Sequence, residues 1–210
     1  MKKIDCFSKK KIGKKLLTTG IVFVTAALSL FTYNKIMDFN AGKFTSSVIS
    51  ELKDYIDSEQ QSEPNIDNSI ENNQFLSNNS SKWVKNYNFI GYISIPKLNL
   101  ELPVISDWDY DKLNVSPCRY SGSLNNKDLV IAAHNYYSHF GNIDRLKKGD
   151  EVIFTDLDGK SYLYEVVLTD TLSSVEINKM TAGEYDLSLF TCTWSGIARV
   201  TIRCNIKHIN

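Results

Sequence analysis

The stretch that decides the fold is SLFTCTWSGIARVTIRC, residues 188–204. It contains two runs rich in apolar and β-branched residues, separated by the small and polar residues of a turn, which is typical of two short β-strands. If the second run returns antiparallel to the first, Cys192 at the end of one strand lies beside Arg199 at the start of the next. The stretch therefore predicts a cysteine and an arginine delivered to one place.

Five further segments upstream have the same strand character. The Asp158-Gly159 pair predicts a hairpin between the last two of them. Many short strands with few helical patterns predict a mainly β fold, an antiparallel barrel or sandwich. The five segments are residues 89–96, 100–105, 128–134, 151–156 and 162–169.

The N-terminus has the pattern of a membrane anchor. Residues 1–15 carry seven lysines against one aspartate, and residues 16–33 contain no charged side chain. Eighteen residues of helix span about 27 Å, close to the thickness of the bilayer's hydrocarbon core. The basic flank predicts a cytoplasmic N-terminus, a single pass through the cell membrane and an extracellular remainder. A cleaved signal peptide, with a cleavage site at residues 24–26, is the alternative and also exports the remainder.

Residues 34–81 are expected to contain a helix followed by a flexible tether. Apolar residues at helical spacing predict an amphipathic helix over residues 41–56, which packs on the folded domain or lies on the membrane surface. Residues 57–81 are rich in Asn, Ser, Gln and Glu, a composition typical of a tether. The folded domain is then expected over residues 82–210. The apolar positions of the helix are Phe44, Val48, Ile49, Leu52, Tyr55 and Ile56.

The composition limits the classes of function that the chain can have. With 210 residues and 42% hydrophobic side chains, the chain holds one ordinary domain with appendages. Lysine and arginine total 24 against 24 acidic residues, so no global field favours nucleic acid as a partner. The sequence has neither a glycine-rich phosphate loop nor metal-ligand spacing. We therefore expect no cofactor and no metal.

The exported part of the chain contains an odd number of cysteines. Cys6 lies in the basic segment, which leaves Cys118, Cys192 and Cys204 on the exported side. At least one extracellular thiol must then be free, and a free thiol is a candidate nucleophile. A disulfide between Cys118 and Cys204 remains possible if Cys192 is the reactive one.

Three scarce residue types form a candidate catalytic set: His134, Cys192 and Arg199. His134 and Cys192 each end a strand, where side chains emerge at the rim of a β scaffold, whereas His139 lies in a loop and His208 in the tail. An imidazole activates a thiol that is mostly protonated at neutral pH. An arginine holds an acyl oxygen as negative charge develops on it. Structural roles for each residue alone are the competing interpretation.

These residues carry a resemblance to sortases, the membrane-anchored cysteine transpeptidases of Gram-positive bacteria. SLFTC resembles the TLxTC strand end of that family, with a serine in place of the first threonine. AAHNYYSHFG is similar to the strand end that carries the sortase histidine, and RVTIR is similar to the family's last strand. GYISIPKLNLELPVI resembles the opening hairpin, so the resemblance covers residues 91–210.

The resemblance implies a closed eight-stranded sortase β-barrel with short helices and a two-step acyl transfer. Cys192 would attack a C-terminal sorting signal, LPxTG-like or NPxTx-like, in an exported protein. His134 would protonate the leaving amine, and Arg199 would stabilise the oxyanion. An amine of a peptidoglycan precursor, or a pilin lysine, would then resolve the thioacyl-enzyme. RVTIR offers a second arginine, Arg203, which lies about 13 Å further along the strand and is expected not to reach the oxyanion.

Subclass and competing functions stay open. The helix and tether before the barrel resemble class B, whereas the short connection over residues 173–185 is nearer to classes A and D. Class B-like is the prediction and class D the runner-up. A cysteine endopeptidase would use the same His134 and Cys192, although the papain-type surroundings of the cysteine are absent. A tethered binding module, with Cys192 merely packed, is the non-enzymatic alternative.

Overall fold

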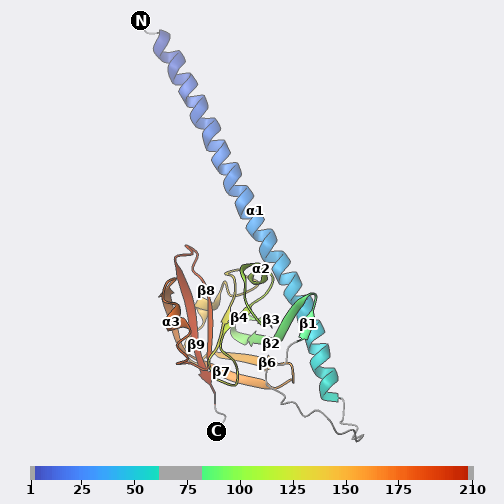
Figure 1. Ribbon diagram of the computed structural model, residues 1–210. Helices are drawn as coiled ribbons and strands as arrows, with labels where there is room; N and C mark the ends of the chain where they lie inside the picture. Colours follow the sequence, from blue (N-terminus) through green and yellow to red (C-terminus); the bar gives the residue numbers. More distant parts are fainter. Residues whose placement is uncertain (1–2, 62–81, 208–210) are drawn as a thin grey trace, which may run out of the picture. The chain divides into compact units, whose positions relative to one another are not determined.

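The computed structural model describes residues 3–61 and 82–207, and its contacts separate two compact units, Met1–Phe39 and Asn40–Asn210. One helix, α1 (Lys3–Gln61), runs from the first unit into the second (Figure 1). The predicted membrane helix and amphipathic helix are therefore one continuous helix. Residues 62–81 of the predicted tether lie outside the described residues.

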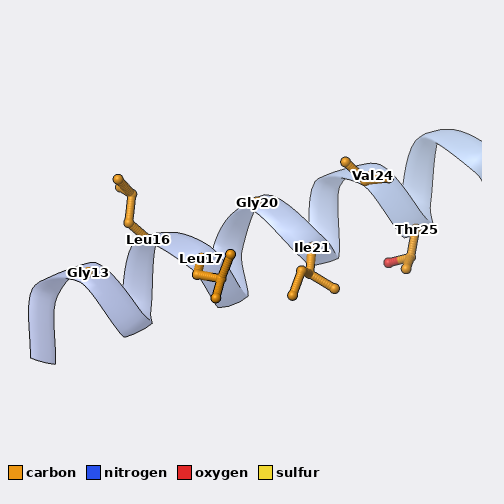
Figure 2. Close-up of a pocket in the computed structure, with 7 residues that line it drawn as sticks. All are labelled: Gly13, Leu16, Leu17, Gly20, Ile21, Val24 and Thr25. Carbon is orange, nitrogen blue, oxygen red and sulfur yellow. The ribbon is translucent and has the colours of Figure 1, made fainter. Parts of the chain in front are cut away.

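The N-terminal part of α1 is a candidate membrane span by length and composition. Among the described residues, Ile12–Ser58 is the one segment that qualifies, and its best 18-residue window has a mean hydropathy of 1.8. Leu16, Leu17, Ile21 and Val24 all project from the helix surface (Figure 2) and are 54% to 75% exposed. Apolar side chains left exposed on every side of a helix are suited to contact with lipid.

The second unit is built from nine strands and short helices. The strands are β1 (Lys82–Val84), β2 (Tyr87–Ile95), β3 (Leu100–Ile105), β4 (Cys118–Ser121), β5 (Leu129–Ala132), β6 (Glu151–Asp156), β7 (Ser161–Ser173), β8 (Leu187–Cys192) and β9 (Ala198–Ile206). The short helices are η1 (Pro96–Leu98), α2 (Tyr110–Leu113), η2 (Ile143–Arg145) and α3 (Ile177–Met180).

Eight of the strands close into a barrel. They pair in the order β2-β3-β4-β5-β8-β9-β7-β6, and a further antiparallel pairing of β6 with β2 closes the ring, while β1 is added at the start of β2. The predicted hairpin joins β6 to β7, with Gly159 at φ +77° in its turn. The predicted closed eight-stranded barrel is thus confirmed. Closure also leaves the eight barrel strands with fewer open edges.

Side chains alternate between the inside and the outside of the barrel. In β8, Leu187 and Leu189 lie fully buried in the barrel core together with Ile202 and Cys204 of β9. Since successive strand residues point to opposite faces, Cys192 and the residues an even number of positions before it face outward. The barrel interior is thus apolar, and the chemistry-bearing side chains lie on its outer face.

The C-terminal part of α1 packs on the barrel. Val48 and Leu52 are fully buried in a cluster with Phe89 of β2, Ile105 of β3 and Cys118 of β4. The expectation that the amphipathic segment packs on the domain is therefore confirmed. Its remaining apolar positions, Ile49, Ile56, Phe44 and Tyr55, are buried or half-buried. The compact unit consequently begins at Asn40, earlier than the catalytic domain predicted over residues 82–210.

A third apolar cluster lies on the outer face of the barrel. It consists of Val130 and Ala132 of β5, Leu172 of β7, Met180 of α3 and Phe190 of β8. We call this set the outer-face cluster. Its members are buried because two segments fold over the barrel wall, the connection that carries α2 and the connection from β7 to β8 that carries α3. A buried apolar strip outside the barrel core marks the wall on which the candidate residues lie.

Candidate active site

Cys192 and Arg199 lie directly opposite each other at one end of the β8–β9 ladder. The turn between them is closed by a hydrogen bond from Thr193 N to Ala198 O of 2.9 Å, and Gly196 takes φ +73° within it. Residues that face each other across an antiparallel pair have Cβ atoms about 4.5 to 5.5 Å apart. The register predicted from the sequence is therefore confirmed, and the two side chains are cross-strand neighbours.

His134 follows the end of β5, which runs parallel to β8. Ala132 is in register with Phe190, and Ala133 N donates to Phe190 O at 3.1 Å. Thr191 adds a buried bond from its Oγ1 to Ala133 O of 2.8 Å. His134 follows two residues after Ala132, as Cys192 follows two residues after Phe190.

Cys192 and Arg199 share the outer face of the barrel, and His134 follows the strand β5 that borders this face. Ala132 lies two residues before His134, Phe190 lies two residues before Cys192, and both belong to the outer-face cluster. Residues two apart in a strand point to the same side. Leu172, a third member of the cluster, is the β7 partner of Arg199. The buried outer-face cluster therefore begins beside the candidate residues.

The imidazole of His134 is half-buried against an aromatic ring. Tyr136 stacks on it with ring centroids 4.9 Å apart and an angle of 28° between the planes. The loop returns through a hydrogen bond from Phe140 N to His134 O of 3.2 Å, and Phe140 is fully buried. Burial disfavours the imidazolium and lowers the pKa of His134 below its ordinary value of 6.5. At neutral pH the imidazole is thus neutral and able to accept a proton.

The guanidinium of Arg199 lies over its own turn. Its Nη1 donates to Gly196 O and to Ala198 O, both at 3.1 Å. These two bonds orient the side chain and do not use its Nε and Nη2 groups. A guanidinium offers five donors in a rigid fork, so Arg199 has donors to spare for a developing oxyanion.

The rim of the site is apolar and exposed. Trp194 and Ile197, in the turn after Cys192, are 78% and 74% exposed. Tyr137, in the loop after His134, contacts Trp194 with ring centroids 6.2 Å apart. Exposed aromatic side chains on both sides of a cysteine favour the binding of a chain-like substrate over the candidate residues.

The other cysteines are packed, inert thiols. Cys118 lies in the cluster beneath α1, Cys204 lies in the barrel interior, and both are free thiols. The possible disulfide between them is therefore wrong, because the barrel wall separates the two sites. Burial raises the pKa of each thiol to about 12. Cys192, in contrast, is partly exposed.

The remaining histidines and the second arginine have other surroundings. His139 is fully buried next to the Tyr136 ring, with centroids 5.6 Å apart, and His208 lies outside the described residues. Arg203 is opposite Ser188, four residues down the ladder from Arg199, and is 3% exposed. Within the described ranges, no three His, Cys, Asp or Glu side chains are grouped to hold a metal.

Comparison with known proteins gives one family. The family model described as the sortase domain matches residues 93–207. Among solved structures, sortase C1 from Streptococcus agalactiae is similar with 23% identity and a TM-score of 0.53, over 79% of this chain and 90% of that one. No curated protein matches the sequence.

Two further structures show the same fold. A Clostridium perfringens sortase D5 transpeptidase has 21% identity and a TM-score of 0.51, over 57% of this chain and 79% of that one. Sortase C1 of GBS Pilus Island 1 has 18% identity and a TM-score of 0.50, over 58% of this chain and 66% of that one, just under two thirds of its length. At these identities the likeness establishes the barrel fold.

Proposed function

The chain belongs to the sortase family of cysteine transpeptidases, and on that premise we propose that it cleaves a C-terminal sorting signal of exported proteins and joins them to a cell-wall amine. The observation that carries the proposal is that Cys192 and Arg199 face each other at one end of the β8–β9 ladder, while His134 follows the end of β5, the strand paired with β8. A thiol, an imidazole and a guanidinium in that arrangement are the groups that acyl transfer requires.

The first step forms a thioester. Cys192 Sγ attacks the carbonyl carbon of the scissile peptide bond, and its proton passes to the neutral imidazole of His134. The carbonyl oxygen becomes an oxyanion, which accepts hydrogen bonds from the Arg199 donors not used by the turn. When the tetrahedral intermediate collapses, the C–N bond breaks and His134 returns its proton to the leaving amine. The acyl group remains on Cys192.

The second step transfers the acyl group to an amine. The incoming amine attacks the thioester carbonyl, and His134 takes the proton that the amine loses. The C–S bond breaks, and the Cys192 sulfur leaves and recovers a proton from the imidazolium. A new amide bond joins the exported protein to its acceptor. His134 returns every proton that it accepts, so the enzyme ends the cycle in its starting protonation state.

The site favours an extended peptide with apolar side chains. The exposed apolar side chains of Trp194, Ile197 and Tyr137 lie around the candidate residues, and the buried outer-face cluster packs beneath the strand ends that carry them. This supports a sorting signal of the LPxTG-like or NPxTx-like kind as the substrate. The acceptor is a peptidoglycan-precursor amine, with a pilin lysine as the alternative.

The location and the class are part of the same proposal. The apolar segment of α1 anchors the chain in the cell membrane, the basic residues before it stay in the cytoplasm, and the barrel works outside. Class B-like, with class D as the runner-up, remains the subclass prediction. The β7–β8 connection contains only the four-residue helix α3, which agrees with the short connection expected from the sequence.

The experiment is a peptide-library assay with the full-length chain in detergent micelles. Sorting peptides are supplied with and without an amine acceptor, and Cys192→Ala is the control. We expect an amide product that requires both the acceptor and Cys192. Free acid at the same rate in both tubes would instead identify an endopeptidase. No product from any peptide would favour the binding module.

A further inference from the structure

Arg203 is a buried guanidinium that the reaction does not use. It lies on the outer face of β9, four residues from Arg199, and it is only 3% exposed. Its separation of about 13 Å along the strand keeps it from the oxyanion. Arginine is almost never fully buried unless its charge is compensated, so the partners of Arg203 need an explanation.

The partners of Arg203 are backbone carbonyls of the β7–β8 connection. Nη1 donates to Met180 O at 3.1 Å and to Ser188 Oγ at 2.9 Å, and Nη2 donates to Lys179 O at 2.8 Å. The guanidinium also lies over the Tyr185 ring, 5.3 Å from its centroid. Four residues from two segments thus surround one side chain.

These contacts hold a segment of the chain through its backbone and do not form an ion pair with an acidic side chain. Lys179 and Met180 are the last residues of α3, and Ser188 is the cross-strand partner of Arg203. A planar guanidinium can bond several acceptors in one fixed geometry, which a single ammonium does not do. Arg203 therefore ties the end of α3 to the β8–β9 ladder. Figure 1 shows α3 beside β9.

The segment that Arg203 holds contributes a side chain to the buried outer-face cluster. The Met180 side chain is 5% exposed and packs in the outer-face cluster with Leu172 and Phe190. Phe190 is two residues from Cys192 on the same face. Arg203 is thus connected, through Met180, to the outer-face cluster beside the nucleophile.

We propose that Arg203 is a positioning residue for substrate binding: it fixes the β7–β8 connection at Lys179 and Met180 and thereby holds the buried Met180 side chain in the outer-face cluster, which supports the surface that binds the apolar part of the sorting signal. This inference rests on the proposed function for the identity of its substrate. The clamp itself is a property of the fold and is testable without turnover.

A positioning role through Met180 separates binding from chemistry. Arg203→Leu fills the volume and removes the donors, whereas Arg203→Lys keeps the charge without the planar fork. We expect KM for the sorting peptide to rise about tenfold in Arg203→Leu, with partial rescue in Arg203→Lys and kcat within about twofold of wild type. The exposed Arg145→Ala is the matched control and should leave both constants unchanged. A loss confined to kcat would overturn the proposal.

A double-mutant cycle tests the route of the effect. Met180→Ala should raise KM by itself. Adding it to Arg203→Leu should raise KM little further, since both changes weaken the same packing in the outer-face cluster. Additive effects on KM would show that Arg203 does not act through Met180. The reaction of Cys192 with iodoacetamide should stay within about twofold in each variant, because the nucleophile itself is untouched.

Trypsin gives a readout that does not depend on the sorting reaction. The carbonyl of the Lys179–Met180 bond is an acceptor of Arg203 Nη2, and the Lys179 side chain is 68% exposed. Cleavage after Lys179 should therefore be about tenfold faster in Arg203→Leu than in wild type or Arg145→Ala. If Arg203→Leu fails to fold, Arg203→Lys decides by the same measurement.

The outcomes are distinct. Unchanged cleavage at Lys179 in a folded Arg203 variant would overturn the clamp, whatever the enzyme does. Faster cleavage in a protein whose wild type turns over no sorting peptide would keep the clamp and reject the proposed function. Faster cleavage with an unchanged KM would overturn the link from the clamp to substrate binding.

Discussion

The two ends of the β8–β9 ladder each carry an arginine on the same face, and the two arginines have opposite surroundings. At one end Arg199 faces Cys192 and lies over an exposed turn, whose carbonyls take two bonds from a single nitrogen. At the other end the buried Arg203 faces Ser188 and donates two buried hydrogen bonds and one part-buried one. Residue type and strand face are the same, so burial and partners alone distinguish a group available for chemistry from one that holds the fold.

The largest expected effect is at the exposed end. Cys192→Ala should reduce turnover of a sorting peptide by more than about 10⁴-fold, because no thioester can form. Thermal unfolding should change little, since the Cys192 side chain is partly exposed. Cys118→Ala, in the cluster beneath α1, is the control that should keep its turnover. Activity in the Cys192 variant would place the nucleophile elsewhere.

The next effect separates the two arginines by rate. Arg199→Ala should lower turnover by about 100- to 1,000-fold, the usual cost of removing an oxyanion donor. Arg199→Lys should rescue poorly because it lacks the fork. Arg203→Lys should lose much less in kcat. Turnover is measured with circular dichroism as the check on folding. A dead Arg203→Lys beside a nearly normal Arg199→Ala would reverse the assignment of the two ends.

Stability should show the opposite order. Arg203→Leu leaves the carbonyls of Lys179 and Met180 and the Ser188 hydroxyl without their donor, at roughly 1 to 3 kcal/mol for each buried acceptor left unsatisfied. Arg199→Ala removes bonds at an exposed turn and should cost at most about 1 kcal/mol. Denaturant unfolding of the full chain measures both. Equal losses would remove the distinction between the ends.

The smallest effect concerns the imidazole at the exposed end. Burial holds the pKa of His134 below 6.5 because the charged form loses solvation. Tyr136→Ala removes the stacked ring and admits water, so the pKa should rise toward 6.5. An NMR titration of the histidine resonances follows this directly. A pKa that stays in place would show that the Tyr136 ring does not shield the imidazole.

Much of the ladder could be predicted from local pattern. SLFTC is a short, mostly apolar run, ARVTIRC alternates apolar and polar residues, and the short turn between them fixes the antiparallel register. That register places Arg199 opposite Cys192 and Arg203 further away, as expected. The position of His134 followed from its place at the end of an apolar run.

Other features depend on tertiary contacts that no local pattern contains. β4 (Cys118–Ser121) was missed because a run of four residues is too short to give a strand signal, and its pairing comes from β3 and β5. The clamp of Arg203 was missed because it depends on the path of the β7–β8 connection. The Cys118–Cys204 disulfide was wrong for the same reason: sequence gives the number of thiols, whereas the fold decides which side of the barrel wall each one occupies.

The central claim is that chemistry belongs to the end of the ladder that carries Cys192, and the acyl-enzyme tests it most directly. The full-length chain is mixed with an excess of a peptide that it turns over, without an amine, then acid-quenched and digested for mass spectrometry. The account predicts an acyl group from the N-terminal part of the peptide on Cys192, lost when an amine is added before the quench. Peptide cleavage with the acyl group on another residue, or with none on any residue, would contradict it.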